Sequence, residues 1–183
     1  YARRQLFELV QNAADAMRDG SGRCEVILTS DRLYVANSGE PFTVNGVVAL
    51  MGTHDSVKRD DQIGRFGLGF KSLLAVTDSP RVFSRSGSFV FDKDESQREL
   101  AAIVPGLHHY PVMRWARAVD PTDASRDDPV LPGMMKWATT VVVAPIRRGR
   151  EVLAESLRKF PAEFLLFSQQ VERLGLEDRA ASG

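Results

Sequence analysis

Apolar residues recur at intervals of three and four between residues 2 and 18, and this spacing predicts a helix with one apolar face. The apolar face consists of Leu6, Leu9, Val10, Ala13, Ala14 and Met17. The run Asp19-Gly20-Ser21-Gly22 that follows is typical of a helix end. The chain therefore opens with an amphipathic helix that needs a partner layer to cover it.

Short stretches rich in β-branched and aromatic residues predict strands. Residues 24–29 and 33–37 are expected to form one hairpin, and residues 81–85 and 88–92 a second hairpin around Ser86-Gly87. Residues 139–146 form a continuous apolar run, which indicates a strand buried on both faces and ending near Pro145.

Further helices are expected over residues 44–51, 67–76, 148–159 and 162–173, with Thr43 as the N-cap of the first of them. Residues 93–137 are the least regular part of the chain. They contain an acidic polar run from Asp120 to Asp128 and the prolines Pro105, Pro111, Pro121, Pro129 and Pro132. We expect long loops there, with a strand over residues 110–115.

Composition narrows the class of protein. Hydrophobic residues make up 43% and charged residues 26% of the 183 positions, as in globular domains. The 24 basic residues balance the 24 acidic ones, which argues against a nucleic-acid module held by bulk charge but not against a local basic patch. No apolar run approaches the roughly 20 residues of a membrane span, and no signal peptide is visible.

The single cysteine, Cys24, cannot form an internal disulfide, and this fits a reducing, cytoplasmic compartment. The chain begins at Tyr1 within a helical pattern. We interpret the sequence as a fragment of a longer polypeptide.

Polar residues of the first predicted helix are also regularly spaced. Glu8, Asn12 and Asp15 are spaced at i, i+4 and i+7, so they share one face of the helix. A glutamate can activate water, and an asparagine oxygen can bind Mg²⁺. A solvated helix face would have the same pattern, so the helix alone leaves both interpretations open.

The glycine-rich run of residues 63–72 contains Gly64, Gly67 and Gly69. Glycine lets a ligand approach the backbone closely, and free amides at the start of a following helix bind phosphate. A glycine turn without a ligand is the alternative. The polar residues 52–62 just before it predict a lid or an ordinary surface loop.

These parts, taken in order, resemble the ATPase superfamily of gyrase, heat-shock chaperones, histidine kinases and MutL. The matching parts are the string Glu8-Leu9-Val10-Gln11-Asn12-Ala13-Ala14-Asp15-Ala16, the string from Asn37 to Phe42, the glycine run up to Ser72, and a late strand opening with Thr140. The likeness spans roughly residues 4–147. The details look most similar to the sacsin and large heat-shock chaperone branch.

The resemblance implies a Bergerat-type ATP-binding fold, an α/β two-layer sandwich with helices on one face of a mixed, mainly antiparallel sheet. Residues 1–147 would form the ATP-binding domain with 93–137 as a loop-rich insertion, and residues 148–183 a helical extension of it. The implied ligands are ATP and Mg²⁺. The implied partners are further domains of the same polypeptide and a second copy, because ATP closes a dimer in many relatives.

The resemblance also assigns roles to single residues. Glu8 matches the general base, Asn12 the Mg²⁺ ligand and Thr140 a threonine near the adenine. The residues expected to bind the nucleotide are Asn12, Asp15, Asn37, Gly39, Phe42, Lys58, Gly64, Arg65, Phe66, Gly67, Leu68, Gly69, Phe70, Lys71 and Thr140.

One residue departs from the superfamily pattern. Most members have an aspartate that accepts the adenine amino hydrogen, where this chain has Asn37. A neutral amide accepts a weaker hydrogen bond, so we expect a weaker preference for adenine than in members with aspartate. Relatives also complete the site with a cation from a following domain or a partner, and we therefore expect weak binding and slow hydrolysis.

Two other functions remain open from the sequence. One is a nucleotide-gated interaction module with little hydrolysis. The other is a diverged histidine-kinase catalytic domain, which needs an upstream helix with a phosphoacceptor histidine that residues 1–183 do not show.

Overall fold

The computed structural model describes residues 2–17, 22–52 and 70–182. Its first half contains α1 (Ala2–Asp15), β1 (Gly22–Leu28), β2 (Arg32–Asn37), α2 (Val44–Met51), the 3-10 helix η1 (Ser72–Ala75), β3 (Arg81–Ser84), β4 (Gly87–Phe91) and α4 (Lys93–Ile103). Its second half contains η2 (Val112–Arg114), β5 (Ala116–Ala118), α5 (Pro121–Ser125), α6 (Leu131–Met135), β6 (Thr140–Pro145), α7 (Arg150–Arg158), α8 (Phe164–Phe167), β7 (Val171–Asp178) and η3 (Arg179–Ser182).

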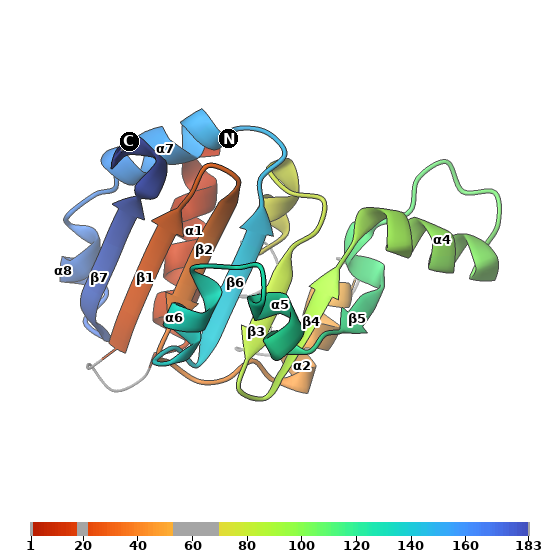
Figure 1. The fold of residues 1–183 in the computed structure, drawn as a ribbon, viewed down its shortest axis with the longest axis horizontal. Helices are drawn as coiled ribbons and strands as arrows, with labels where there is room; N and C mark the ends of the chain where they lie inside the picture. Colours follow the sequence, from red (N-terminus) through yellow and green to blue (C-terminus); the bar gives the residue numbers. More distant parts are fainter. Residues whose placement is uncertain (1, 18–21, 53–69, 183) are drawn as a thin grey trace.

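The strands of these described residues form one seven-stranded sheet in the order β5-β4-β3-β6-β2-β1-β7 (Figure 1). All neighbouring strands are antiparallel except β1 and β7, which are parallel. The apolar strand β6 lies between β2 and β3, as expected for a strand buried on both faces. The expected mixed, mainly antiparallel sheet is therefore confirmed.

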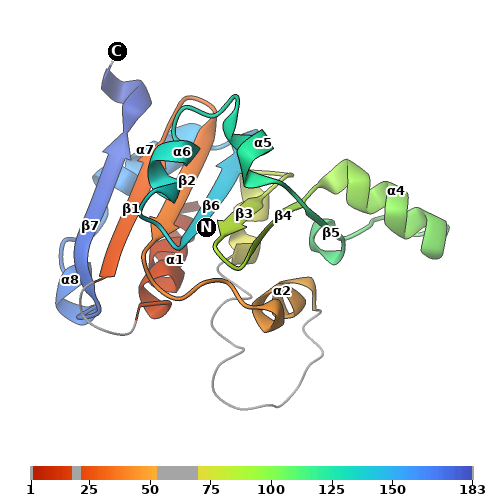
Figure 2. The same cartoon turned by 60° about the horizontal axis from the view of Figure 1, so that its bottom comes forward.

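One face of the sheet is covered by α1 and α7 (Figures 1 and 2). Leu6 and Val10 of α1 and Leu153 of α7 share a buried core with Val26 of β1 and Val35 of β2. We call this the helix-facing side of the sheet. It confirms the two-layer α/β sandwich, in which the apolar face of the first helix packs on the sheet.

The opposite face of the sheet is covered by a shorter segment. Leu131 and Met134 of α6 pack there against Tyr34 of β2 and Val143 of β6. The guanidinium of Arg23 lies 4.0 Å from the ring centroid of Trp137, just after α6. The segment with α5 and α6 therefore adds short helices to the second face, which the sequence did not predict.

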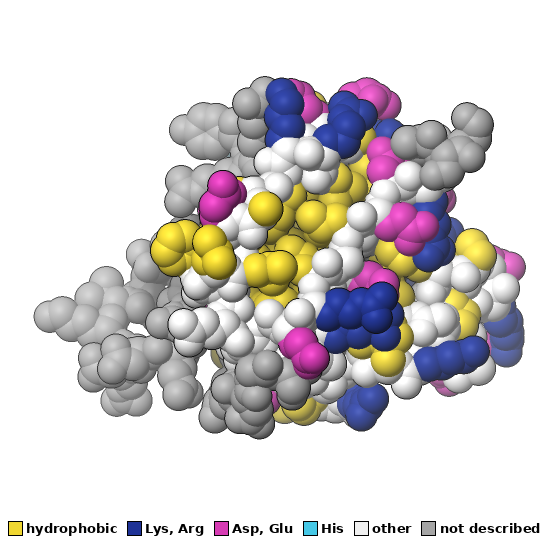
Figure 3. Space-filling view, turned by 90° about the vertical axis from the view of Figure 1, so that its left-hand side faces the viewer, with side chains coloured by type: hydrophobic (Ala, Val, Ile, Leu, Met, Phe, Trp, Pro, Cys, Tyr) yellow, Lys and Arg dark blue, Asp and Glu magenta, His cyan; other side chains and the backbone are white. Residues whose placement is uncertain are grey.

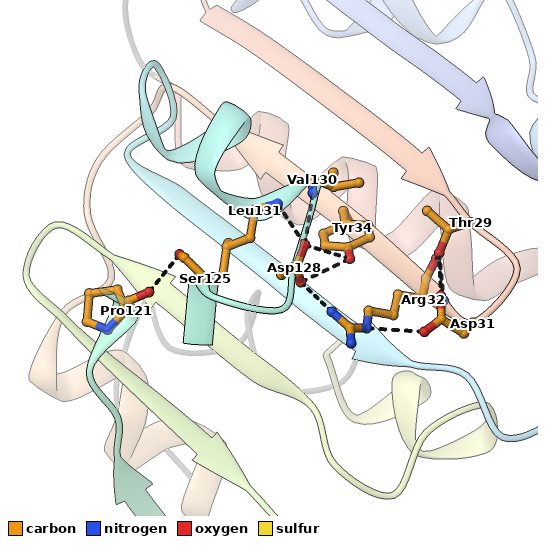
Figure 4. A network of polar contacts seen from close by, with 9 residues as sticks. All are labelled: Thr29, Asp31, Arg32, Tyr34, Pro121, Ser125, Asp128, Val130 and Leu131. Atoms are coloured by element: carbon orange, nitrogen blue, oxygen red, sulfur yellow. Dashed lines mark hydrogen bonds and ion pairs between the residues drawn. The ribbon is translucent and has the colours of Figure 1, made fainter. Parts of the chain in front are cut away.

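A buried polar network fixes this segment to the sheet (Figure 4). The carboxylate of Asp128 accepts hydrogen bonds from the Tyr34 hydroxyl at 3.0 Å, from Arg32 at 2.7 Å, and from the amides of Val130 and Leu131 at 3.0 and 2.9 Å. Asp128 is only 5% exposed. Burial raises the pKa of Tyr34 to about 12, so its hydroxyl stays a donor to this carboxylate at neutral pH.

The expectation of long loops over residues 93–137 was wrong in two places. Residues 93–103 form the helix α4, whose N-cap Asp92 accepts a hydrogen bond from the Glu95 amide at 2.9 Å. The strand expected over residues 110–115 is replaced by η2, and the actual strand β5 follows at 116–118. Helix α4 extends away from the sheet (Figure 1).

One further helix prediction was wrong. The helix expected over residues 162–173 covers only 164–167, and the chain then enters β7, which pairs with β1. The helix expected over residues 67–76 is helical from residue 70 to residue 75 in its described part, with residues 70 and 71 in an α-helix and residues 72–75 in the 3-10 helix η1. The helix expected over residues 148–159 is present as α7. Helix α2 begins as expected after Thr43, whose hydroxyl accepts a hydrogen bond from the Gly46 amide.

None of the helices in the described parts of the chain is both long and apolar enough to cross a bilayer.

Candidate functional site

The polar stripe of α1 lies at the rim of the helix-facing core. Glu8, Asn12 and Asp15 are each half-buried, whereas Leu9 and Ala13 between them are buried. The side-chain amide of Gln11 donates to the Asp15 carboxylate at 3.0 Å. The stripe is thus neither a core face nor a fully solvated one, and such a position suits side chains that meet a ligand.

The turn after β2 rests directly on the end of α1. The amide of Glu40 donates to the carbonyl oxygen of Ala16 at 2.8 Å. Gly39 lies so close to α1 that an added Cβ would be 2.4 Å from this same oxygen. The predicted motif from Asn37 to Gly39 is therefore held next to the C-terminal end of the helix that carries Glu8, Asn12 and Asp15.

Asn37 itself is buried at the end of β2. Its side-chain oxygen accepts a hydrogen bond from the Gly39 amide at 3.0 Å, which shapes the turn. Its backbone carbonyl accepts a hydrogen bond from the Thr139 amide at 2.8 Å. One lone pair of the side-chain oxygen is thus in use, and the amide nitrogen supplies the additional donors that aspartate lacks.

A row of polar side chains crosses the sheet at this end. Asn37 is opposite Cys24 of β1 and Thr140 of β6, and Thr140 is opposite Ser84 of β3. Side chains alternate between the faces of a strand. Leu33 and Val35 of β2 and Val82 of β3 belong to the helix-facing core, so Asn37 and Ser84 point to the same side.

Ser84 is a site residue that the sequence did not predict. Its hydroxyl lies 3.0 Å from the Thr140 hydroxyl and accepts a hydrogen bond from the Phe42 amide at 2.9 Å. The hydroxyl of Ser86 donates to the Phe42 carbonyl, and the ring of Phe42 meets Phe89 edge-on at 5.6 Å between centroids. These contacts bring the predicted residues Asn37, Phe42 and Thr140 to one end of the sheet.

Two of the predicted nucleotide-binding residues, which follow the glycine run, contact other parts of the protein. Phe70 is buried and meets Phe91 edge-on, with 6.4 Å between centroids. The ammonium group of Lys71 donates to the carbonyl of Gly52 at 3.0 Å. Seven predicted residues lie outside the described ones: Lys58, Gly64, Arg65, Phe66, Gly67, Leu68 and Gly69.

Within the described residues, no three side chains of His, Cys, Asp or Glu form a group that could hold a metal ion. Mg²⁺ commonly takes one or two protein oxygens together with phosphate oxygens and water, so Asn12 beside a nucleotide fits such an ion better than a cage made by protein alone. Burial raises the pKa of the Cys24 thiol to about 12, with the charge of Glu25 adding to the effect. Cys24 is therefore a protonated core residue at neutral pH.

No protein-family model matches the chain. Over 96 residues, half of this chain, it is 33% identical to Protein NO VEIN of Arabidopsis thaliana, of which the match covers 4%. Over 126 residues, 51% of this chain, it is 28% identical to Chaperone protein HtpG of Shewanella amazonensis, of which the match covers 20%. The match spans a small fraction of either relative's length. The chain thus has distant similarity, over half its length, to a chaperone protein of the superfamily that its motifs resemble.

Proposed function

We propose that the chain is an ATP- and Mg²⁺-binding domain that hydrolyses ATP slowly and drives conformational change in a larger, chaperone-like or defence-like protein. The observation that carries this proposal is the row of Asn37, Thr140 and Ser84 on the helix-facing side of the sheet. The turn that begins at Asn37 rests against the C-terminal end of α1, the helix that carries the polar stripe. The order of the motifs and the distant similarity to HtpG support the same interpretation.

Each described residue has a role in this proposal. Glu8 would orient and deprotonate the water that attacks the terminal phosphate. Asn12 would bind Mg²⁺, whose charge would offset that of the phosphates when the nucleotide is bound. Asn37 would face the adenine, with Thr140 and Ser84 behind it. The glycine run of residues 64–69 would supply backbone amides to the phosphates.

Slow turnover follows from how phosphoryl transfer is catalysed. Positioning and electrostatic stabilisation account for most of the rate enhancement, and a cation from outside the domain supplies part of it in related ATPases. Residues 148–183 instead contribute α7 and α8 to the helix layer and β7 to the sheet. We expect the isolated chain to bind nucleotide but to hydrolyse it slowly.

A nucleotide-gated interaction module is the second candidate, and Asn37 favours it. Its side-chain oxygen already accepts the Gly39 amide, and it is uncharged, so the bond to an adenine amino group is weaker than in relatives with aspartate. This candidate predicts a small difference between the affinities for ATP and GTP.

The test is a calorimetric titration with a non-hydrolysable ATP analogue and Mg²⁺, run with a phosphate-release assay. We expect binding by the parent, loss of binding in Gly67→Val/Gly69→Val, and retained binding without hydrolysis in Glu8→Ala. The exposed Glu151→Ala on α7 serves as the matched control for removal of a glutamate. A parent that binds no nucleotide would contradict the proposal, and hydrolysis unchanged in Glu8→Ala would contradict the role of Glu8.

A further inference from the structure

The strand β7 leaves one edge of the sheet open. It is the last strand in the order, it runs for eight residues, and among the described residues it pairs only with β1. An edge strand presents a row of unpaired backbone donors and acceptors, and proteins usually shorten, charge or cover such edges. An edge strand of this length is therefore a candidate for pairing with another strand.

Exposed apolar side chains accompany this edge. Leu165, Leu166 and Phe167 of α8 are 41%, 72% and 85% exposed, and Leu176 of β7 is 36% exposed. Figure 3 looks at this end of the molecule and shows hydrophobic side chains gathered in the middle, with charged ones around them. Contiguous apolar surface rimmed by charge is typical of a protein interface.

The side chains of β7 divide between the two faces in a defined way. Leu174 and Leu176 are in register with Cys24 and Val26, which belong to the helix-facing core, so both leucines lie on that side. Arg173, Gly175 and Glu177 alternate with them and lie on the opposite face. Gly175 is the midpoint of this five-residue stretch.

We propose that β7 pairs antiparallel with β7 of a second copy of the chain, around a two-fold axis between the two Gly175 residues. Leu174 of each copy then lies opposite Leu176 of the other on the helix-facing side. Arg173 lies opposite Glu177 on the other face. Each pair occurs twice, so the sequence of the strand is complementary to itself, and the two sheets join into one.

No neighbouring register has this complementarity. An axis at Leu174 would place Arg173 opposite Gly175, and an axis at Leu176 would place Arg173 opposite Arg179. An axis at Arg173 or at Glu177 would place like charges opposite each other. Of the axes within residues 173–177, the one at Gly175 alone pairs arginine with glutamate.

The ends of the strand also limit the pairing to residues 173–177. The register of β7 with β1 shifts between residues 171 and 173, and this irregularity interrupts the ladder at Glu172. Beyond the other end, Asp178 is already paired with Arg150 at 2.5 Å. The like charges of Glu172 and Asp178 therefore lie outside the paired stretch. Glu177 has an exposed partner, Arg179 at 3.0 Å, and such surface pairs exchange readily.

Sedimentation of the 183-residue chain without nucleotide, from micromolar to near-millimolar concentration, tests the proposal, and it is independent of ATP binding. We expect a monomer–dimer equilibrium. Arg173→Glu and Glu177→Arg should each raise the dimer dissociation constant about tenfold or more, because both replace two attractive cross-strand pairs by repulsive ones. Arg98→Glu on α4, at the far end of the sheet, is the matched control and should change nothing (Figure 1).

Mixing the two single variants gives a sharper result. The glutamate introduced at position 173 of the first variant then lies opposite the arginine introduced at position 177 of the second. The remaining pair joins the native Arg173 of the second variant to the native Glu177 of the first. The mixture should therefore form heterodimers with the dissociation constant of the parent, although each variant alone should dimerise about tenfold or more weakly.

The double variant Arg173→Glu/Glu177→Arg restores an attractive pair at both places and should regain the dissociation constant of the parent. A parent that stays monomeric at every concentration overturns the proposal, and so does a dimer that neither charge reversal weakens.

Discussion

Gly39 offers a direct test of the contact between the turn after β2 and helix α1. An added Cβ would lie 2.4 Å from the Ala16 oxygen and 2.6 Å from its carbon, well inside normal contact distance. The oxygen cannot move aside alone, because it accepts the Glu40 amide at 2.8 Å. Gly39→Ala must therefore push the turn away from the helix. We expect the free energy of unfolding to fall by about 1–3 kcal/mol, the usual cost of overpacking.

The same displacement moves Asn37, because its side chain binds the Gly39 amide. We therefore expect Gly39→Ala to weaken nucleotide binding as well as stability. Urea denaturation followed by circular dichroism measures the first effect, and titration with the ATP analogue measures the second. Gly133→Ala on α6 is the matched control, since among the described residues no heavy atom beyond its neighbours and its own helix backbone lies within 4 Å of the added Cβ. Alanine within a helix should stabilise the chain by up to about 1 kcal/mol.

The backbone conformation of Gly39 does not complicate the comparison. The glycines with positive φ among the described residues are Gly87, Gly106 and Gly149, so alanine at position 39 meets a steric limit rather than a conformational one. A Gly39→Ala variant that is as stable as Gly133→Ala, and that binds the analogue like the parent, would refute the reasoning. The turn would then not rest on α1.

Three further predictions concern the core. Asp128→Ala removes the acceptor of buried donors and should lower the free energy of unfolding by about 3–5 kcal/mol in urea denaturation, whereas a loss below about 1 kcal/mol would contradict the network. Phe164→Ala should cost about 3–5 kcal/mol in the same assay, because this side chain is buried against Phe7 and the α1 core. Since burial raises the pKa of Cys24 from 9.0 to about 12, the unfolded chain loses the thiol proton first, and stability should fall as pH rises through this window. Denaturation curves recorded between about pH 8 and 11 give the slope of the unfolding free energy against pH, and Cys24→Ala should make this slope smaller. An unchanged slope would count against a buried thiol.

The sequence predicted best where local signals and tertiary packing agree. Thr43 caps α2 as its hydroxyl and position suggest, and the hairpin of β1 and β2 follows from alternation and a short polar turn. The central position of β6 follows from its continuous apolar run. The role of Ser84 was not predictable, because nothing local to the second hairpin says that β3 pairs with β6.

The wrong predictions have physical causes that can be named. Helix α4 begins with the capping residues Asp92 and Glu95, but its fully buried residue is Ser96, so it lacks an apolar face to mark it. The apolar run from Phe164 to Phe167 has helical character, and it led to a helix prediction that extended through the start of β7. The partner of β7 is β1, close to the other end of the chain, and no local pattern specifies such a pairing.

The packing of α7 and α8 on α1 has a consequence for the folding of the newly made chain. The Phe7 ring lies 5.9 Å from Phe160 and 5.5 Å from Phe164, between centroids, and Leu157 lies in the same core as Leu6. During synthesis, the first helix leaves the ribosome long before these partners exist. The strands β1 and β2 can cover part of its apolar face early, but the part that meets α7 and α8 must stay uncovered, or bind something else, until almost the whole domain has been translated. We therefore expect a late folding step, in which the last segments made complete the packing of the earliest helix.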